Sequence, residues 1–419
     1  MLRRFLPLFV VCALGAGCAP DEPEAERPRP SAAPAAATET TAPEAPGASD
    51  EPERAPAPGS TSEAAPGATG QVEPPAAAAA TDEPVVLVAG GDVCLGREEG
   101  QRLLRDPGHD ELALVARLWD DADLRFVNLE SVLSDQHGET VHPASRLVFT
   151  GPPNGAEALA RARIELVSLA NNHAWDYGES ALFETFDNLE RAGVGWVGAG
   201  RDRARAWEPV IVERRGLRIA FVAVTAIWNQ ALPAHPGKER VADAAERDAL
   251  VAAITRARAS ADVVAVSYHG LDEYVDTPIP AKRAVFQLAV DAGADLVLGH
   301  HPHVPQRAAL LAGRPVFYSL GNLLMSMKTG VMLTGLGFVA RIELRRGAPP
   351  ALSVCPYRIH YLQPIPLAAD ERRAQTEPYA RAELTRLFSQ ARHFSDERAL
   401  TLGAFDARGC APLVPEPER

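Results

Sequence analysis

The sequence predicts an α/β fold with a largely parallel sheet for the part of the chain that begins at about residue 84. Short runs rich in valine and leucine, each ending abruptly in polar residues, have the composition of strands that are buried on both faces. Segments rich in alanine, leucine, glutamate and arginine lie between these runs, and their apolar residues recur at three- and four-residue spacing, which predicts helices. Strands that alternate with helices are typical of parallel α/β sheets.

The predicted strands are short apolar runs that each end beside a polar group. Six runs have this form, at 85–89, 124–127, 166–170, 263–268, 296–298 and 315–320. A further strand is predicted at 218–225, and a later β section at 337–344 and 352–362.

The predicted helices fill the segments between these strands. They cover 156–163, 179–192, 243–259 and 281–292, and a final helix covers 370–390. Gly193 and Gly293 stand where helices of this kind end, because glycine adopts the left-handed conformation of a helix C-terminus at little cost.

The N-terminal segment has the features of an exported protein. Residues 1–17 combine two arginines, an apolar run and small residues, as a secretory signal does, and the run is too short to span a bilayer in the mature protein. Small residues directly before Cys18 predict lipidation of Cys18. The chain is therefore expected to be a lipoprotein of the cell envelope, periplasmic or on the outer surface; the alternative is a soluble secreted form cleaved nearby.

The composition changes sharply along the chain and predicts four parts. After the signal peptide (1–17), residues 18–83 hold the lipidated cysteine and a linker of Ala, Pro, Glu, Ser and Thr that cannot bury enough apolar surface to order itself. Residues 84–365 form the folded domain, and residues 366–419 form a C-terminal helix and tail.

Charge and cysteine content exclude some classes of protein. The formal net charge of −13 argues against a nucleic-acid partner, since nucleic-acid binders usually present a basic face. Cys94, Cys355 and Cys410 are too widely spread for a zinc finger or a disulfide framework. A single bridge between Cys355 and Cys410 is compatible with an exported protein, but their spacing does not establish it.

Polar residues with ligand chemistry follow five of the predicted strands. Because strands of a parallel sheet deliver their carboxyl ends to one edge, these residues are expected to meet there. Each alone could cap a helix or form a turn; together they predict a metal site made by Asp92, Glu130, Asn172, His269, His301 and His303.

The ligand types indicate the class of metal. Carboxylates, an amide oxygen and imidazoles without thiolate suit Mn, Fe or Zn, and three histidines make a site for Mg or Ca alone less favourable. A carboxylate shared by two divalent ions would hold them about 3.5–4 Å apart, as in hydrolytic two-metal centres.

The same residues resemble those of a known family. Segments 91–97, 128–130, 171–178, 299–303 and 319–322, and His269 with Glu273 and Tyr274, are similar in order and spacing to the CapA (poly-γ-glutamate capsule synthesis) family, a branch of the calcineurin-like metallophosphatase superfamily. The resemblance runs from about residue 85 to 362. It implies a four-layer α-β-β-α sandwich of the metallophosphatase type, which the strand pattern alone does not distinguish from a three-layer sheet.

The resemblance also implies roles for the site residues. Asp92 stands where the superfamily binds its first metal and Glu130 where it bridges both, whereas Cys94 replaces the usual histidine of the Asp-x-His motif. Asn172, His269, His301 and His303 match the remaining metal ligands. His173 matches the residue that protonates the leaving oxygen; the alternative is that it only orients Asn172.

Other polar residues of these motifs are expected to contact the substrate or to brace the ligands. They are Asn128, Asn171, Asp176, Glu273 and Asn322, and bracing is favoured for Asp176 and Glu273. An extended backbone would send His300 to the side opposite His301, as a supporting residue. Cys94 is expected to be a buried small side chain, and Arg97 and Arg146 either receive an anionic substrate or pair with acids. The remaining histidines have no ligand pattern around them and are expected at the surface or in loops; they are His109, His137, His142, His235, His360 and His393.

These observations give one leading functional hypothesis and two alternatives. The leading one is an envelope protein anchored to the membrane by its lipid, with a two-metal phosphoesterase-like site, which acts with a synthesis or export complex on an anionic capsule polymer such as poly-γ-glutamate. The first alternative is a metal-dependent envelope phosphodiesterase or phosphomonoesterase without a polymer partner. The second is a non-catalytic subunit in which the metals shape a binding surface.

Overall fold

The structure, a computed structural model, describes residues 83–229, 236–325, 327, 331–369, 373–389, 394 and 396–416. The predicted signal peptide, Cys18 and all of the predicted linker except Glu83 lie outside these residues, as do His235 and His393. The described residues belong to one compact unit. None of its helices is both long enough and apolar enough to cross a membrane.

The unit is a mixed α/β fold built on one 16-stranded sheet, and two parallel runs of strands position the site. The first run consists of β7 (Gly195–Val197), β6 (Leu166–Ser168), β2 (Leu124–Leu129) and β1 (Val85–Val93). The second consists of β13 (Arg314–Leu320), β11 (Leu296–His300), β10 (Val263–His269) and β9 (Leu217–Thr225).

Antiparallel strands join the two runs and complete the sheet. The connection passes through β15 (Leu336–Leu344), β16 (Ala351–His360), β19 (Ala411–Pro415), β18 (Glu397–Leu402) and β12 (Pro305–Leu311). Strand β8 (Val210–Arg214) lies at the far edge, while β14 (Asn322–Leu324) pairs with β1 and β17 (Gln363–Pro366) with β16. A separate small sheet holds β3 (Val132–Leu133), β5 (Ser145–Gly151) and β4 (Val141–His142).

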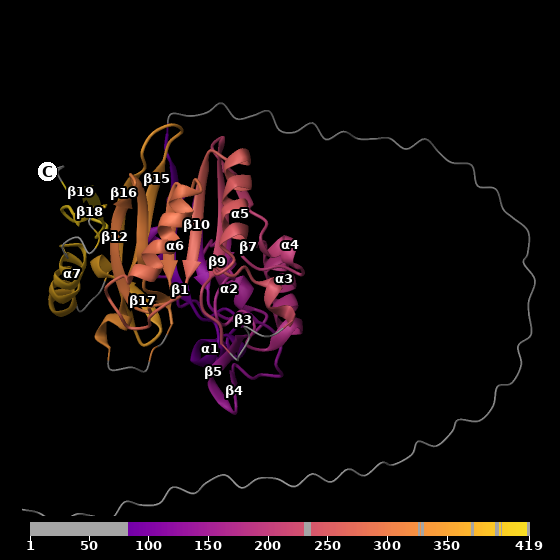
Figure 1. Ribbon diagram of the computed structural model, residues 1–419. Helices are drawn as coiled ribbons and strands as arrows, with labels where there is room; N and C mark the ends of the chain where they lie inside the picture. Colours follow the sequence, from indigo (N-terminus) through magenta and orange to yellow (C-terminus); the bar gives the residue numbers. More distant parts are fainter. Residues whose placement is uncertain are drawn as a thin grey trace, which may run out of the picture. The chain divides into compact units, whose positions relative to one another are not determined.

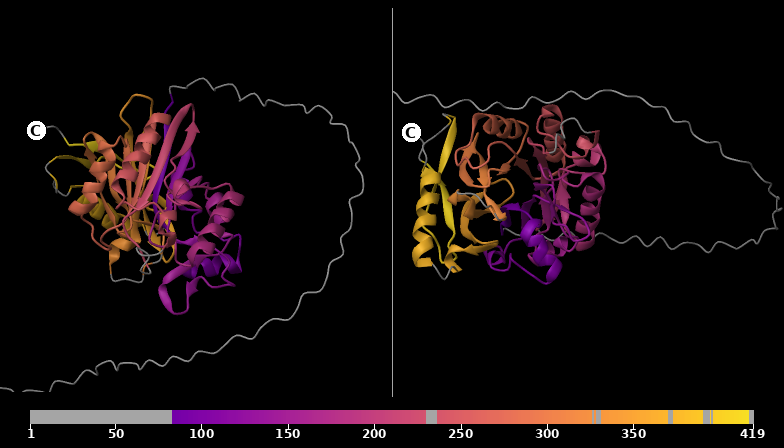
Figure 2. Two further views of the ribbon diagram at one scale, coloured as in Figure 1. Left: turned by 45° about the vertical axis from the view of Figure 1, so that its right-hand side comes forward. Right: turned by 90° about the horizontal axis from the view of Figure 1, so that it is seen from below.

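The α-helices of the described residues pack against strands of the main sheet, against the small sheet or against other helices. They are α1 (Arg97–Arg105), α2 (Gly155–Arg161), α3 (Gly178–Ala192), α4 (Arg203–Ala206), α5 (Arg247–Ser260), α6 (Pro280–Asp291) and α7 (Arg373–Ser389). Short 3-10 helices occupy Val115–Leu118, Pro236–Arg240, Met332–Gly335 and Leu367–Ala369. Helix α5 contacts β9 and β10, α6 contacts β11 and β13, and α7 contacts β12 and β18 (Figure 1). Figure 2 shows the C-terminal elements, in yellow, on the opposite side of the unit from α3 and α4.

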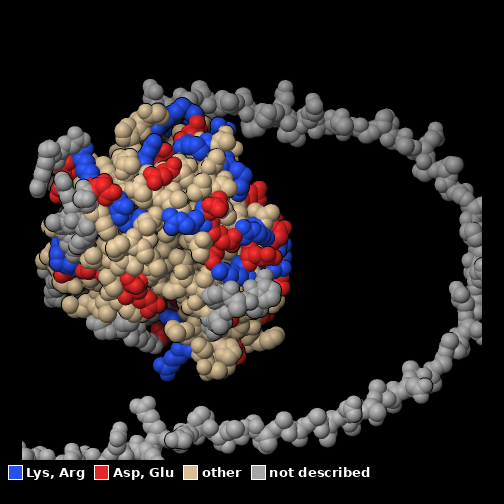
Figure 3. All heavy atoms as spheres, in the orientation of Figure 1, with Lys and Arg blue, Asp and Glu red and all other residues tan. Residues whose placement is uncertain are grey.

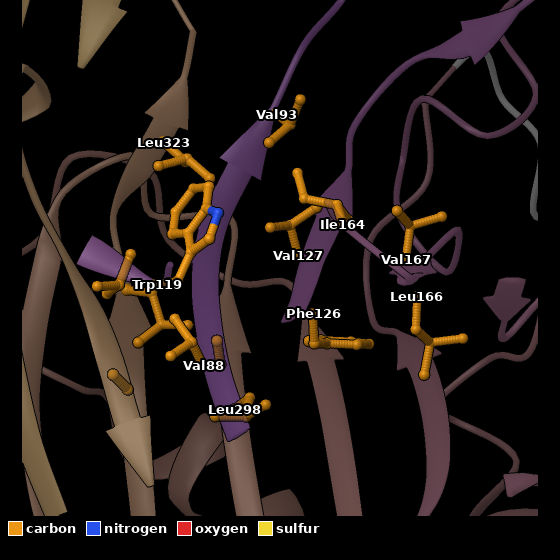
Figure 4. Packing of buried hydrophobic residues seen from close by; sticks show 14 of the residues in the cluster. Val88, Val93, Trp119, Phe126, Val127, Ile164, Leu166, Val167, Leu298 and Leu323 are labelled. Carbon is orange, nitrogen blue, oxygen red and sulfur yellow. The ribbon is translucent and has the colours of Figure 1, made fainter. Parts of the chain in front are cut away.

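The main hydrophobic core lies between the two parallel runs. Phe126 of β2 stacks on Phe221 of β9, with ring centroids 5.1 Å apart, although the two strands are far apart in the sheet order. Figure 4 shows the side chains of this core around β1, including Val88 and Leu298, which belong to one cluster of buried residues. Burial on both faces is what the Val- and Leu-rich strand sequences require.

The predicted strands and helices are largely confirmed, and the differences have physical causes. The helix predicted at 243–259 begins later, at Arg247. The final helix, predicted at 370–390, is α7. Helix α1 was not predicted because its sequence is nearly all polar, with Leu103 as its one large buried apolar residue. Strands β18 and β19 were not predicted after the final helix; they are short and depend on pairing with β12 and β16.

Candidate metal centre

The centre begins where β1 ends, and a glycine permits its close packing. Asp92 is aligned with Asn128 of β2 on one side and Asn322 of β14 on the other. The Asp92 N–H donates to the carbonyl oxygen of Gly321, 3.0 Å away. A Cβ atom at Gly91 would lie 1.9 Å from that same oxygen, so only glycine allows this approach.

The turn after β11 supplies two imidazoles from an unusual backbone conformation. His301 has φ 93° and His303 has φ 57°, values that non-glycine residues rarely adopt. The His301 N–H donates to Asp92 Oδ2 at 3.2 Å, and His303 Nδ1 lies 2.9 Å from Asn322 Oδ1. Strain of this kind persists where the surroundings hold the residues, and here both side chains join the groups of ligand atoms at this edge of the sheet.

Three overlapping groups of side chains offer ligand atoms within 4.8 Å of one another. Glu130 belongs to one group with His269 and His301, and to a second with Asp92 and His303. The third group joins Glu273 to His301 and His303. Asn172 is beside them, since its Oδ1 lies 2.8 Å from His269 Nε2. The structure therefore brings all six predicted metal ligands together.

Glu130 provides the test of whether these residues fit a metal. Both of its carboxylate oxygens are buried and have no hydrogen-bond partner. Nitrogens of His269, His303 and His173 lie 3.5 Å, 3.9 Å and 3.9 Å from Glu130 Oε1. Burial, reinforced by the charge of Asp92, raises the pKa of Glu130 well above its usual value. Since an uncompensated buried carboxylate is costly, a divalent cation fits this position.

The protonation tendencies of the neighbours favour metal binding. Burial, aided by the adjacent imidazoles, lowers the pKa of His269 and of His301 well below the usual value, so both rings are neutral donors at neutral pH. Burial opposes ionisation of Asp92, but the nearby His300 and His303 outweigh it and lower its pKa. Neutral imidazoles and an ionised aspartate are the forms that coordinate a cation.

His173 lies at the rim of the group and is firmly oriented. Its Nδ1 is 2.8 Å from Asp176 Oδ2, which also accepts the Phe149 N–H at 2.9 Å. The Phe149 ring stacks on the imidazole with centroids 4.0 Å apart. Sequence reasoning missed Asn229, whose amide nitrogen lies 3.3 Å from His173 Nδ1; only the fold brings its loop to this place.

The predicted supporting residues form a buried hydrogen-bond network. Asn128 donates to Asp92 Oδ1 at 2.8 Å and lies 3.1 Å from His269 Nδ1. Asn171 donates to Asn128 Oδ1 and accepts the His173 N–H, while Asn322 contacts His303. Asn128, Asn171 and Asn322 thus brace ligands, as Asp176 braces His173.

His300 and Glu273 flank the centre in different environments. His300 is fully buried, and its Nδ1 lies 3.4 Å from Asp92 Oδ1, the oxygen opposite the one that faces the His301 N–H. It therefore supports Asp92. Glu273 is exposed and reaches His301 and His303 from the solvent side.

Cys94 is not among the ligand groups found in the described residues. It is buried with Phe149 and Met325, and burial raises the pKa of its thiol to about 12. A neutral thiol is a poor metal ligand, so the structure favours the packing role for Cys94.

A cavity of about 970 Å³ lies beside α1, and none of the six proposed ligands is among its lining residues. Its lining includes Cys94 and four arginines, Arg97, Arg102, Arg105 and Arg146. The Arg97 guanidinium lies 4.2 Å from the centroid of the Phe149 ring, the ring that stacks on His173. On the face shown in Figure 3, basic and acidic side chains are interspersed among other residues.

The fold and site define a mixed α/β protein whose strand ends gather ligands suited to divalent metal ions. The chain belongs to the bacterial capsule synthesis protein PGA_cap family, which matches residues 86–327, and this confirms the resemblance to CapA proteins. It is 26% identical over 288 residues to the PGA biosynthesis protein CapA of Bacillus subtilis strain 168, covering 68% of this chain and 74% of that protein. It is 27% identical over 287 residues to the capsule biosynthesis protein CapA of Bacillus anthracis, covering 67% and 68%.

A solved structure, that of a hypothetical protein from Thermus thermophilus, is similar at 20% identity with a TM-score of 0.43. The match covers 66% of this chain and 100% of that one.

Proposed function

We propose that this protein is an envelope-anchored capsule-synthesis protein of the CapA type, with two divalent transition-metal ions (Mn, Fe or Zn) in a hydrolytic site. The proposal rests on one observation above all. The carboxylate of Glu130 is buried without a hydrogen-bond partner while imidazoles approach it from several strands. Two overlapping ligand groups share this carboxylate, as a bridging ligand would be shared.

The chain's own residues divide between the two ions around Glu130. One ion would be held by Asp92, Glu130 and His303, and the other by Glu130, His269 and His301. Asn172 supplies an amide oxygen next to His269. When bound, such ions act as Lewis acids on a phosphoryl oxygen and lower the pKa of a water molecule.

His173 is proposed to protonate the leaving oxygen of the substrate. Its Nε2 faces the centre, 3.9 Å from Glu130 Oε1, while Asp176 holds its Nδ1 and fixes the ring. A ring held in this orientation keeps Nε2 directed at the centre, which is the geometry that a general acid needs. If His173 only orients Asn172, its removal will alter metal binding rather than turnover alone.

The substrate is proposed to be anionic, either a phosphoester or an anionic capsule polymer such as poly-γ-glutamate. The four arginines of the cavity support this, because guanidinium groups bind carboxylates and phosphates. The names of the Bacillus relatives support a role in polymer synthesis. A synthesis or export complex is the partner that this proposal assigns. Membrane attachment through Cys18, in the cell envelope, remains part of the proposal.

The finer architecture is proposed to be the four-layer α-β-β-α sandwich of calcineurin-like metallophosphatases. The stacking of Phe126 on Phe221 supports two facing layers of strands. The contacts of α5 and α6 with the second parallel run, and of α3 with β7, support helical layers on the outside.

The position of Cys94 favours a second candidate function, a non-catalytic metal-binding subunit. The family resemblance implies a histidine ligand at position 94. This chain has Cys94 there, and Cys94 is buried with Phe149 and Met325. The first metal site would then have one ligand fewer, and the metals would shape a binding surface for the polymer. An envelope phosphodiesterase or phosphomonoesterase without polymer partner would use the same residues as the leading proposal.

The experiment that tests the proposal is Mn-dependent hydrolysis of a generic phosphodiester and a phosphomonoester by the purified chain, with metal content measured on the same sample. Turnover that falls in His173→Ala while metal is retained supports hydrolysis. Two bound ions without turnover on either ester favours the scaffold. A metal-free wild-type protein would remove the basis of both.

A further inference from the structure

A second group of ligand-type side chains lies beside the arginine-lined cavity, apart from the centre around Glu130. Glu99 of α1 and His109 and Glu111 of the following loop each place one ligand atom within 4.8 Å of the others. The expectation that His109 has no ligand pattern around it is wrong. The chain after α1 folds back, so that His109 Nε2 lies 3.0 Å from Glu111 Oε1.

Two atoms of this triad, Glu99–His109–Glu111, are buried without a hydrogen-bond partner. Glu99 is 2% exposed, and its Oε2 accepts no hydrogen bond; His109 Nε2 is close to Glu111 but makes no hydrogen bond either. Buried polar atoms are normally paired, and an orphaned carboxylate oxygen is among the costly exceptions. Burial raises the pKa of Glu99 to about 7, with Arg102 opposing and Asp110 adding to the shift.

The charge of the triad is only partly balanced within the protein. Arg102 forms an ion pair with Glu111, which leaves the carboxylate of Glu99 without a cation of its own among the described residues. Two carboxylates and one guanidinium leave a net negative charge when both acids are ionised. The ion pair with Arg102 therefore balances the charge of Glu111 but not that of Glu99.

We propose that Glu99, His109 and Glu111 bind a divalent transition-metal ion of their own, with no ligand from the main centre. Two carboxylates and an imidazole without thiolate suit zinc or manganese. Three protein ligands leave a coordination position for water or for an anionic group. Because Glu99 and Arg102 both line the cavity, the ion adds positive charge to the wall that carries the arginines.

The test is the zinc content of the full chain. Chelated protein is loaded with Zn²⁺ alone, freed of excess metal, and measured as metal equivalents per chain. Wild type is compared with Glu99→Gln and His109→Ala, and with Glu98→Gln, an exposed glutamate of the same helix, as the matched control. Glu130→Ala removes the main centre and leaves the triad intact.

The expected result is one zinc equivalent fewer in Glu99→Gln and in His109→Ala than in wild type, with Glu98→Gln unchanged. Glu130→Ala keeps one equivalent that disappears when His109→Ala is added, which separates this proposal from the fate of the main centre. Wild-type zinc content in both triad variants overturns it. Glu99→Gln is nearly isosteric and carries the test if His109→Ala does not fold. A zinc-edge anomalous map without a peak between Glu99 and Glu111 overturns it independently.

Discussion

The Nε2 atom of His269 lies 3.5 Å from the Oε1 atom of Glu130. The two residues stand at the ends of strands from different parallel runs, since His269 ends β10 and Glu130 follows β2. The Glu130 carboxylate has no hydrogen-bond partner. Nearby, His269 Nδ1 meets Asn128 at 3.1 Å. Asn128 thus fixes the imidazole so that its other nitrogen, Nε2, faces the carboxylate. Histidines that bind metals are commonly oriented in this way, by a hydrogen bond to the ring nitrogen that does not bind the metal.

His173→Ala should lower the turnover of a phosphodiester by about 10²–10⁴-fold with bound metal unchanged, because a general acid contributes on this scale. Steady-state kinetics and metal analysis on one preparation provide the measurement. His142→Ala, an exposed histidine outside the centre, is the control and should behave as wild type. Equal turnover in His173→Ala and wild type would assign the proton to another group.

Gly91→Ala should both destabilise the protein and weaken metal binding. The new Cβ would lie 1.9 Å from the Gly321 carbonyl oxygen, so the end of β1 must move away from β14 and carry Asp92 with it. Overpacking of this kind costs about 1–3 kcal/mol in the free energy of unfolding.

Denaturant unfolding with and without Mn²⁺ measures both effects of Gly91→Ala. Gly335→Ala is the control, since its Cβ meets nothing closer than 3.6 Å. Stability and metal response equal to the control would show that β1 and β14 are not held this tightly.

Lys282→Met should stabilise the protein at pH 6 and have less benefit at pH 9. Lys282 is buried and donates to Gln306 Oε1 and the Tyr318 carbonyl oxygen, and burial lowers its pKa to about 7 from 10.5. Between these values the unfolded chain binds a proton that the folded protein does not, so wild-type stability rises with pH across this window. Below pH 7 the amine is charged in the folded and the unfolded state, so the folded protein bears the full free-energy cost of burying the charge.

Unfolding curves of wild type and Lys282→Met at the two pH values provide the measurement. A difference in unfolding free energy that is the same at pH 6 and pH 9 would show that Lys282 titrates normally in the folded state. Arg314→Met, an exposed cation on β13, serves as the control and should show little pH dependence.

The double variant Cys355→Ser with Cys410→Ser should lower the free energy of unfolding by about 2–4 kcal/mol, the usual range for a disulfide. The Cys355–Cys410 bridge spans 55 positions and ties β19 to β16. Metal content should not change, since neither cysteine belongs to the ligand groups found in the described residues. Identical unfolding curves under oxidising conditions would show that the bridge does not form.

Sequence reasoning located the centre because its ligands are local events, each at the end of a strand with a strong apolar pattern. Asp92, Glu130 and His269 need no long-range information to be recognised as strand-end residues. The residues that the sequence did not predict are those whose surroundings come from distant segments of the chain. Asn229 and the triad of Glu99, His109 and Glu111 have no periodic pattern and meet their partners only after folding.

The disulfide and the C-terminal strands illustrate the same limit in the fold. Spacing left the pairing of Cys355 with Cys410 open, and the structure forms it because β19 lies against β16. A strand as short as β19, with a proline at each of two positions, carries too little local signal to be predicted alone. Its place is set by its neighbours in the sheet.

Anomalous diffraction from crystals of the full chain grown with Mn²⁺ tests the proposed centre most directly. Two manganese peaks should flank the carboxylate of Glu130, one toward Asp92 and His303 and the other toward His269, and both should vanish in Glu130→Ala. An ordered Glu130 side chain with no manganese peak beside it in the wild-type crystal would contradict the two-metal centre.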